Sequence, residues 1–141
     1  MGLDVNGKAR AAHQRGTLSD RPFRGDVDGS EKEYFFNYFG GSDRLYVFEA
    51  PIDLMSFLTL NKHSYWQQHN FLALGGLSDR ALIRFLKEHP NIKHIVFCFD
   101  NDANAKKKDG TPDVNHGQIM AKRYLVEYKR KSREKKNLTL S

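Results

Sequence analysis

Three acidic residues follow two short apolar segments of the chain, and side chains of this type could support phosphate chemistry. Glu49 comes directly after residues 45–48 (LYVF), and residues 95–99 (IVFCF) run into Asp100 and, two positions on, Asp102. Apolar runs of this length are typical of strands that are buried on both faces. If the two strands are parallel neighbours, their carboxyl ends bring all three carboxylates to one edge of a sheet.

Clustered carboxylates repel one another, and a hard divalent cation relieves that repulsion. Mg²⁺ takes one or two carboxylates and keeps waters that a substrate phosphate can displace, so it can polarise a phosphoryl oxygen. The structural alternative is that acidic residues simply end strands as turn formers or helix caps. A bare Asp-x-Asp is common, so Asp100 and Asp102 need supporting context before a metal site is inferred.

The elements around these residues alternate between strand and helix. Strands are expected at residues 45–48, 71–74 and 95–99. Helices are expected from Pro51, which suits the first helical position, from residue 79, and from about Gly117. This order predicts an α/β fold with a central parallel sheet, right-handed crossovers and helices on both faces.

The first 43 residues differ in composition from the rest of the chain. Residues 1–33 are polar and weakly periodic, which predicts an irregular or short-β N-terminal extension. Residues 34–39 (YFFNYF) are aromatic-rich and end at Gly40-Gly41, which predicts a strand closed by a turn. We therefore expect an extension over residues 1–43 and one α/β domain over residues 44–141.

The basic character of the chain is concentrated near its C-terminal end. The net charge is +6, and residues 104–136 hold eleven Lys and Arg against four Asp and Glu. Clustered basic residues favour a nucleic-acid partner, and a solvated helix surface is the alternative. The candidate nucleic-acid-binding residues are Lys106, Lys107, Lys108, Lys122, Arg123, Lys129, Arg130, Lys131 and Arg133.

Composition excludes several classes of protein. The chain has 141 residues, which fits one domain, and no apolar run approaches the roughly 18 residues that cross a bilayer. The N-terminus lacks the apolar region of a secretory signal. Cys98 is the single cysteine, so an internal disulfide and a cysteine-based zinc site are both excluded. A cytoplasmic location without a membrane partner is expected.

Three segments in this order resemble the motifs of toprim domains. Residues 47–53 (VFEAPID) are similar to the first motif, a hydrophobic strand followed by Glu and, four positions later, Asp. Residues 97–102 (FCFDND) are similar to the second, a strand ending in Asp-x-Asp. Residues 74–78 (LGGLS) resemble the turn between them in bacterial primases. The chain looks most like the toprim segments of primase- or relaxase-like proteins of plasmids and conjugative elements.

The resemblance implies a Rossmann-like toprim fold and Mg²⁺- or Mn²⁺-dependent chemistry on nucleic-acid phosphodiesters. Glu49 matches the general acid or base of the family, and Asp100 and Asp102 match its metal ligands. Asp53 matches a further acidic position that binds a second ion or orients the site, and Glu49 can also contact the metal. The implied partners are DNA, single-stranded DNA above all, or RNA, together with other domains of a larger protein.

Two features depart from the family pattern. Ala105 stands where many toprim domains have Gly, and a polar insertion comes after it, so Gly117 is the alternative start of the next helix. The chain also ends at Ser141, where a further strand is usual in the family. The sequence therefore looks like a domain cut from a larger protein.

Several functions fit this pattern. The leading hypothesis is primase-like nucleotidyl transfer on DNA, and nuclease- or topoisomerase-like strand cleavage uses the same residues. A non-catalytic nucleic-acid-binding module would keep the fold and the basic segment without needing all four acidic residues. A phosphatase of the haloacid dehalogenase type is disfavoured, because its Asp-x-Asp belongs to a first motif with Thr or Val two positions later.

Overall fold

The computed structural model describes residues 1–76, 78–99, 119 and 122. It divides the chain into two compact units, Met1–Cys98 and Phe99–Ser141. In the second unit, Ile119 and Lys122 are helical and exposed. The strands and the other helices of the described residues all belong to the first unit. None of the helices in the described ranges has the length and apolar character that a bilayer crossing requires.

The first unit is built on a mixed four-stranded sheet with strand order β5-β7-β6-β8. Strand β6 pairs in parallel with both β7 and β8, whereas the edge strand β5 runs antiparallel to β7. The sheet and its connections comprise η1 (Lys32–Tyr34), β5 (Asn37–Tyr38), β6 (Arg44–Phe48), α1 (Pro51–Leu60), η2 (Trp66–Gln68), β7 (Asn70–Ala73), α2 (Arg80–Glu88) and β8 (His94–Cys98). The three parallel strands lie where the apolar runs predict them. The aromatic segment 34–39 contributes only the two-residue strand β5.

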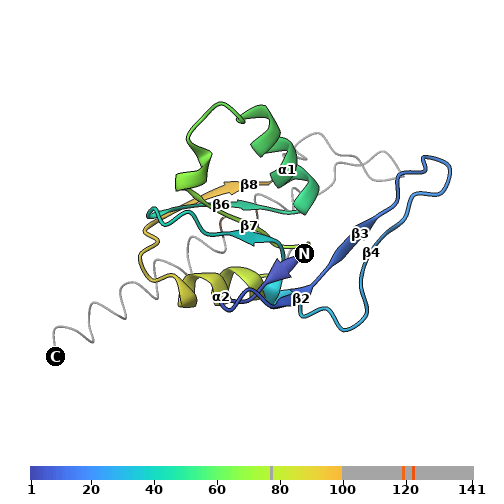
Figure 1. The fold of residues 1–141 in the computed structure, drawn as a ribbon, viewed down its shortest axis with the longest axis horizontal. Coiled ribbons are helices and arrows are strands. Elements are labelled where there is room, and N and C mark those ends of the chain that lie inside the picture. Colours follow the sequence, from blue (N-terminus) through green and yellow to red (C-terminus); the bar gives the residue numbers. More distant parts are fainter. Residues whose placement is uncertain (77, 100–118, 120–121, 123–141) are drawn as a thin grey trace. The chain divides into compact units, whose positions relative to one another are not determined.

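Helices α1 and α2 lie on opposite faces of the sheet (Figure 1). Helix α1 begins at Pro51 and packs its buried Leu54 against Phe48 and Phe71. Successive residues of a strand point to opposite faces, so the buried Leu45 and Val47 of β6 point away from α1. On that second face, α2 contacts β7 and buries Ala81, Leu82 and Phe85. The helix-spaced apolar residues of both segments therefore serve as predicted.

Four short strands precede the sheet and replace the irregular arm that the polar composition suggests. Strands β1 (Gly2–Leu3) and β2 (Ala9–Ala11) form one antiparallel pair, and β3 (His13–Arg15) and β4 (Arg24–Asp26) form another. The second pair carries almost no buried side chain, because every residue of it except Gly25 is exposed. Strands without an apolar face give no period-two hydrophobic pattern, which is why the sequence does not reveal them.

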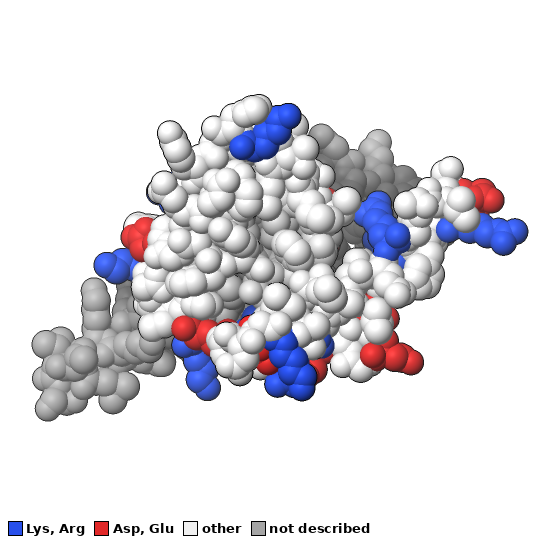
Figure 2. All heavy atoms as spheres, viewed as in Figure 1, with Lys and Arg blue, Asp and Glu red and all other residues white. Residues whose placement is uncertain are grey.

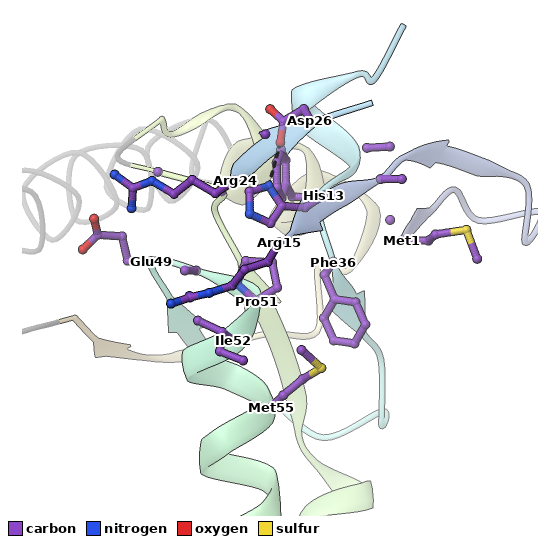
Figure 3. Close-up of a pocket in the computed structure, with 18 residues that line it drawn as sticks. Met1, His13, Arg15, Arg24, Asp26, Phe36, Glu49, Pro51, Ile52 and Met55 are labelled. Atoms are coloured by element: carbon purple, nitrogen blue, oxygen red, sulfur yellow. Dashed lines mark hydrogen bonds and ion pairs between the residues drawn. The ribbon is translucent and has the colours of Figure 1, made fainter. Parts of the chain in front are cut away.

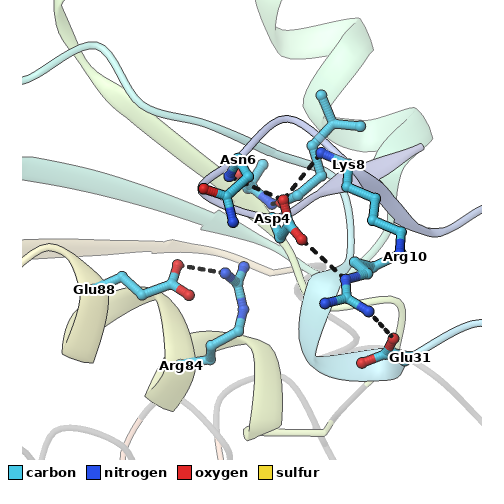
Figure 4. Close-up of polar contacts among 9 residues, drawn as sticks. Asp4, Asn6, Lys8, Arg10, Glu31, Arg84 and Glu88 are labelled. Atoms are coloured by element: carbon cyan, nitrogen blue, oxygen red, sulfur yellow. Dashed lines mark hydrogen bonds and ion pairs between the residues drawn. The ribbon is translucent and has the colours of Figure 1, made fainter.

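Polar contacts hold the β1–β2 pair and η1 in place (Figure 4). Asp4 accepts the Lys8 amide and the Arg10 side chain, each at 3.0 Å, and Arg10 also pairs with Glu31. The Lys8 amide, followed by the Arg10 and Asn6 donors, holds the pKa of the Asp4 carboxyl below its ordinary value. These contacts close the turn between β1 and β2 and join β2 to the start of η1.

Tyr34 then connects η1 to α2. The guanidinium of Arg84, on α2, lies 4.3 Å from the centroid of the Tyr34 ring, within cation–π range. Arg84 also donates to the Glu33 carbonyl and pairs with Glu88 one turn along its own helix. The N-terminal strands are thus anchored to the α2 side of the sheet.

A buried asparagine sets the geometry at the amino ends of β6 and β7. Asn70 is fully buried, and its Oδ1 accepts the backbone amides of Gly40 and Gly41 at 3.0 and 3.1 Å. Its Nδ2 donates to the carbonyls of Ser42 and Arg44 at 2.7 and 2.9 Å. One side chain therefore satisfies four backbone groups of the turn that leads from β5 into β6.

We predict that Asn70→Ala lowers the free energy of unfolding by about 2–4 kcal/mol, because it leaves several partly buried backbone groups without partners. Urea denaturation of the whole chain measures this. Asn6→Ala, in the exposed turn between β1 and β2, is the matched control and should change stability by less than about 0.5 kcal/mol. Equal effects of the two substitutions would contradict the anchoring role of Asn70.

Candidate functional site at the end of strand β6

Glu49 lies at the carboxyl end of β6, immediately after the last paired residue of the strand. It is half-buried and lines a pocket of about 520 Å³. Strand β6 lies between β7 and β8, with Phe48 paired to Ala73 on one side and to Cys98 on the other. In open parallel sheets, ligands bind outside the carboxyl ends of the strands, and Glu49 occupies such a position.

A glycine turn holds the backbone of Glu49. The Gly76 amide donates to the Glu49 carbonyl at 3.1 Å, and the Leu74 amide donates to the Phe48 carbonyl at 2.9 Å. Both Gly75 and Gly76 have positive φ, at 66° and 127°. A Cβ at Gly75 would also overlap the ring of the buried Phe35. Glycine is therefore required here for backbone conformation and for close packing.

The pocket is formed by three parts of the chain that are distant in sequence (Figure 3). Strands β3 and β4 contribute charged side chains, the end of β6 and the first turns of α1 contribute Glu49 and apolar residues, and the glycine turn forms part of the wall. Its residues are Met1, Gly2, Ala11, Ala12, His13, Arg15, Arg24, Gly25, Asp26, Phe35, Phe36, Glu49, Ala50, Pro51, Ile52, Met55, Gly75 and Gly76.

The other predicted site residues divide into described and undescribed ones. Asp53 is half-buried in the first turn of α1 and does not line the pocket. Lys122 is exposed. The remaining predictions lie outside the described residues: Asp100, Asp102, Lys106, Lys107, Lys108, Arg123, Lys129, Arg130, Lys131 and Arg133. Within residues 1–76, 78–99, 119 and 122, no three His, Cys, Asp or Glu side chains gather closely enough to hold a metal ion.

The donors near the end of β6 suit a hard cation. Cys98 ends β8 beside this edge, but it packs against the apolar cluster under α1, and burial raises the pKa of its thiol. A buried, protonated thiol is a poor metal ligand. The oxygen donors Glu49 and Asp53 are left, and carboxylate oxygens are the ligands that Mg²⁺ prefers in proteins. The chemistry of the available donors therefore fits Mg²⁺, although the described residues alone do not complete a site.

Charge on the described surface is balanced. Residues 1–99 carry twelve Lys and Arg and eleven Asp and Glu. In the face that Figure 2 shows, both signs are mixed near α2 and along the β3–β4 pair, and few charged side chains cover α1. The basic surplus of the sequence thus belongs to residues beyond 99.

Comparison with known families supports a toprim domain. Residues 46–109 match the family model described as Toprim-like. The matched segment contains Glu49, Asp53, Asp100 and Asp102 and excludes β1 to β5. Toprim domains bind Mg²⁺ through acidic residues and act on nucleic acids. No curated protein and no solved structure matches the chain significantly.

Sequence reasoning missed the charged side of the pocket. Arg15 and Arg24 come from the segment expected to be irregular, and they face the same pocket as Glu49. The sequence does carry a weak signal, because HQR and RGD are three-residue segments separated by a stretch that contains Gly16 and Pro22, as in a long hairpin. Their pairing is a long-range property that no local pattern fixes.

We predict that Gly75→Ala destabilises the chain more than Gly7→Ala does. Both glycines have positive φ, at 66° and 77°, but the space around Gly7 is open, whereas at Gly75 the new methyl group meets Phe35. Backbone strain costs about 1–2 kcal/mol at each position, and overpacking adds about 1–3 kcal/mol at Gly75. Urea denaturation measures the difference. Equal losses would show that the turn can move away from Phe35 without cost.

Proposed function

We propose that this chain is a Mg²⁺- or Mn²⁺-dependent toprim domain that carries out primase-like nucleotidyl transfer on DNA. The observation that carries the proposal is the position of Glu49. It stands at the carboxyl end of a central parallel strand, in a pocket, and within the segment that matches the Toprim-like model. A carboxylate so placed can reach a phosphate that binds at the sheet edge.

Asp100 and Asp102, together with Glu49 and Asp53, are the proposed metal ligands. Phe48 pairs with Cys98 in parallel register, and the sequence has Asp100 two positions after Cys98. When bound, the ion would polarise a phosphoryl oxygen and offset the charge that builds up there. The carboxylates contribute the negative charge that attracts the ion.

Glu49 is the proposed general base. In nucleotidyl transfer, the oxygen of a 3′-hydroxyl bonds to the α-phosphorus of a nucleoside triphosphate. The bond from that phosphorus to the bridging oxygen breaks, and pyrophosphate leaves with the electron pair. The Glu49 carboxylate accepts the hydroxyl proton, a role that requires an ionised side chain within hydrogen-bond reach of the hydroxyl.

The basic residues of the C-terminal part are the proposed nucleic-acid contacts. They are Lys106, Lys107, Lys108, Lys122, Arg123, Lys129, Arg130, Lys131 and Arg133. Their charge would neutralise backbone phosphates of a single-stranded template without reading its sequence. We also propose that residues 44–141 form the toprim domain of a larger mobile-element protein.

Glu49→Gln tests the catalytic proposal. It should lower nucleotide incorporation by the intact protein by about 10²–10⁴-fold, because an amide cannot accept the proton at neutral pH. Affinity for single-stranded DNA should stay the same, because removing one carboxylate does not remove an attraction to phosphate. Primer extension and filter binding measure the two quantities separately.

The matched control is Glu31→Gln, which removes the same charge from an exposed residue whose pair with Arg10 spans 3.2 Å. It should keep full incorporation. Full incorporation by Glu49→Gln would contradict the catalytic role and favour a non-catalytic nucleic-acid-binding module. Shortened strands in place of extended primers would replace nucleotidyl transfer by strand cleavage.

A further inference from the structure

Two arginines face each other across the β3–β4 pair. The register places Arg15 opposite Arg24, and His13 opposite Asp26. Residues that are directly opposite in an antiparallel pair project from the same face, and all four of these side chains line the pocket. Gln14, which alternates with them, does not line it. One face of the pair is thus directed at the pocket.

The two cross-strand pairs differ in electrostatics. His13 and Asp26 compensate each other through a contact of 2.8 Å between Nδ1 and Oδ1. Arg15 and Arg24 are like charges, which destabilise a strand pair when directly opposite. Among the described residues, neither arginine takes part in an ion pair. An anion between the two guanidinium groups would remove this repulsion, and paired arginines are well suited to phosphate oxygens.

The charged and apolar parts of the pocket are arranged for a ligand with two different ends. Figure 3 shows both guanidinium groups extending toward the side on which Glu49 lies, and Phe36, Ile52 and Met55 lining another part of the wall. The volume of about 520 Å³ lies within the range of about 300–1,000 Å³ that is typical of small-molecule sites.

The start of α1 adds to the attraction for an anion. Ala50 is the N-cap residue, and no side chain caps the helix, so its first turn offers backbone N–H groups without a side-chain partner. Ala50 and Pro51 line the pocket. Helix N-termini favour negative charge, and here that effect adds to the two arginines.

We propose that this pocket binds a nucleoside triphosphate, with Arg15 and Arg24 holding its phosphates and the apolar wall receiving its base. The inference deepens the proposed function, on which it rests for the reaction that consumes the nucleotide. It assigns a substrate-binding role to strands β3 and β4, which lie outside the segment that matches the Toprim-like model. Phosphates held by the two arginines lie on the side of the pocket that Glu49 faces.

Calorimetric titration of the whole chain with ATP tests the proposal, once with Mg²⁺ and once with EDTA. The variant R15Q/R24Q should bind ATP at least tenfold more weakly than the wild type in both conditions. The control R80Q/R44Q removes two exposed arginines from outside the pocket and should bind like the wild type. Because the EDTA arm needs no metal, failure of the metal-dependent function leaves it informative.

A second pair of variants tests the apolar wall without touching the arginines. Met55→Glu adds a carboxylate at the pocket and should weaken ATP binding, whereas Leu60→Glu makes the same type of change at an 85% exposed position of the same helix and should not. Both positions are exposed, so both variants should fold.

Three results would overturn the proposal. The first is the absence of ATP binding by the wild type, and the second is unchanged binding by R15Q/R24Q. The third is a loss confined to a single-stranded oligonucleotide titrated in parallel, which would assign the arginines to the phosphates of a strand. Loss of nucleotide incorporation in Glu49→Gln with ATP binding retained would leave both proposals standing.

Discussion

The parallel pairing of β6 with both of its neighbours is the constraint on which the rest of the structure depends. Because Phe48 is in register with Ala73 and with Cys98, the three strands end at the same edge of the sheet. The residues that come after each strand therefore begin at that edge: Glu49 after β6, the glycine turn after β7, and the chain that leads to Asp100 after β8. A one-residue slip of β6 would exchange its faces, taking Phe48 from the α1 cluster and Leu45 and Val47 from the opposite side. The apolar alternation that makes the core therefore also places the acidic residue.

Two devices fix the ends of these strands. Asn70 satisfies four backbone groups where the chain enters β6, and Gly76 donates to the Glu49 carbonyl where the chain leaves it. The N-terminal strands then close the other side of the pocket, held to α2 through Tyr34 and Arg84. The result is a pocket in which a carboxylate and two arginines line the same space. Opposite charges in one pocket suit a reaction in which phosphate must be held while a proton is removed.

Much of the sheet can be predicted from the sequence because its strands are continuous apolar runs, such as residues 45–48 and 95–98, and its helices carry apolar residues at helical spacing, such as Ala81, Leu82 and Phe85. Glu49 and Asp53 could be singled out because they stand next to these elements. The N-terminal strands could not be predicted, since β3 and β4 bury no side chain and depend on pairing between segments separated by eight residues. The antiparallel direction of β5 and the role of Gly75 beside Phe35 also depend on contacts between distant segments. The acidic pair Asp100 and Asp102 and the basic segment lie outside the described residues, so their roles rest on sequence and family resemblance.

The central claim is that the carboxylates after β6 and β8 bind a divalent cation together. Calorimetric titration of Mg²⁺ and Mn²⁺ into the wild-type chain and into D100N/D102N tests this claim most directly. D20N/D28N, which removes two exposed carboxylates, is the matched control for the change in net charge. The account predicts weak binding by the wild type and by the control, and none by D100N/D102N, because Mg²⁺ keeps most of its waters and depends on the few carboxylates that replace the rest. Titrations of D100N/D102N that coincide with those of the wild type would contradict it.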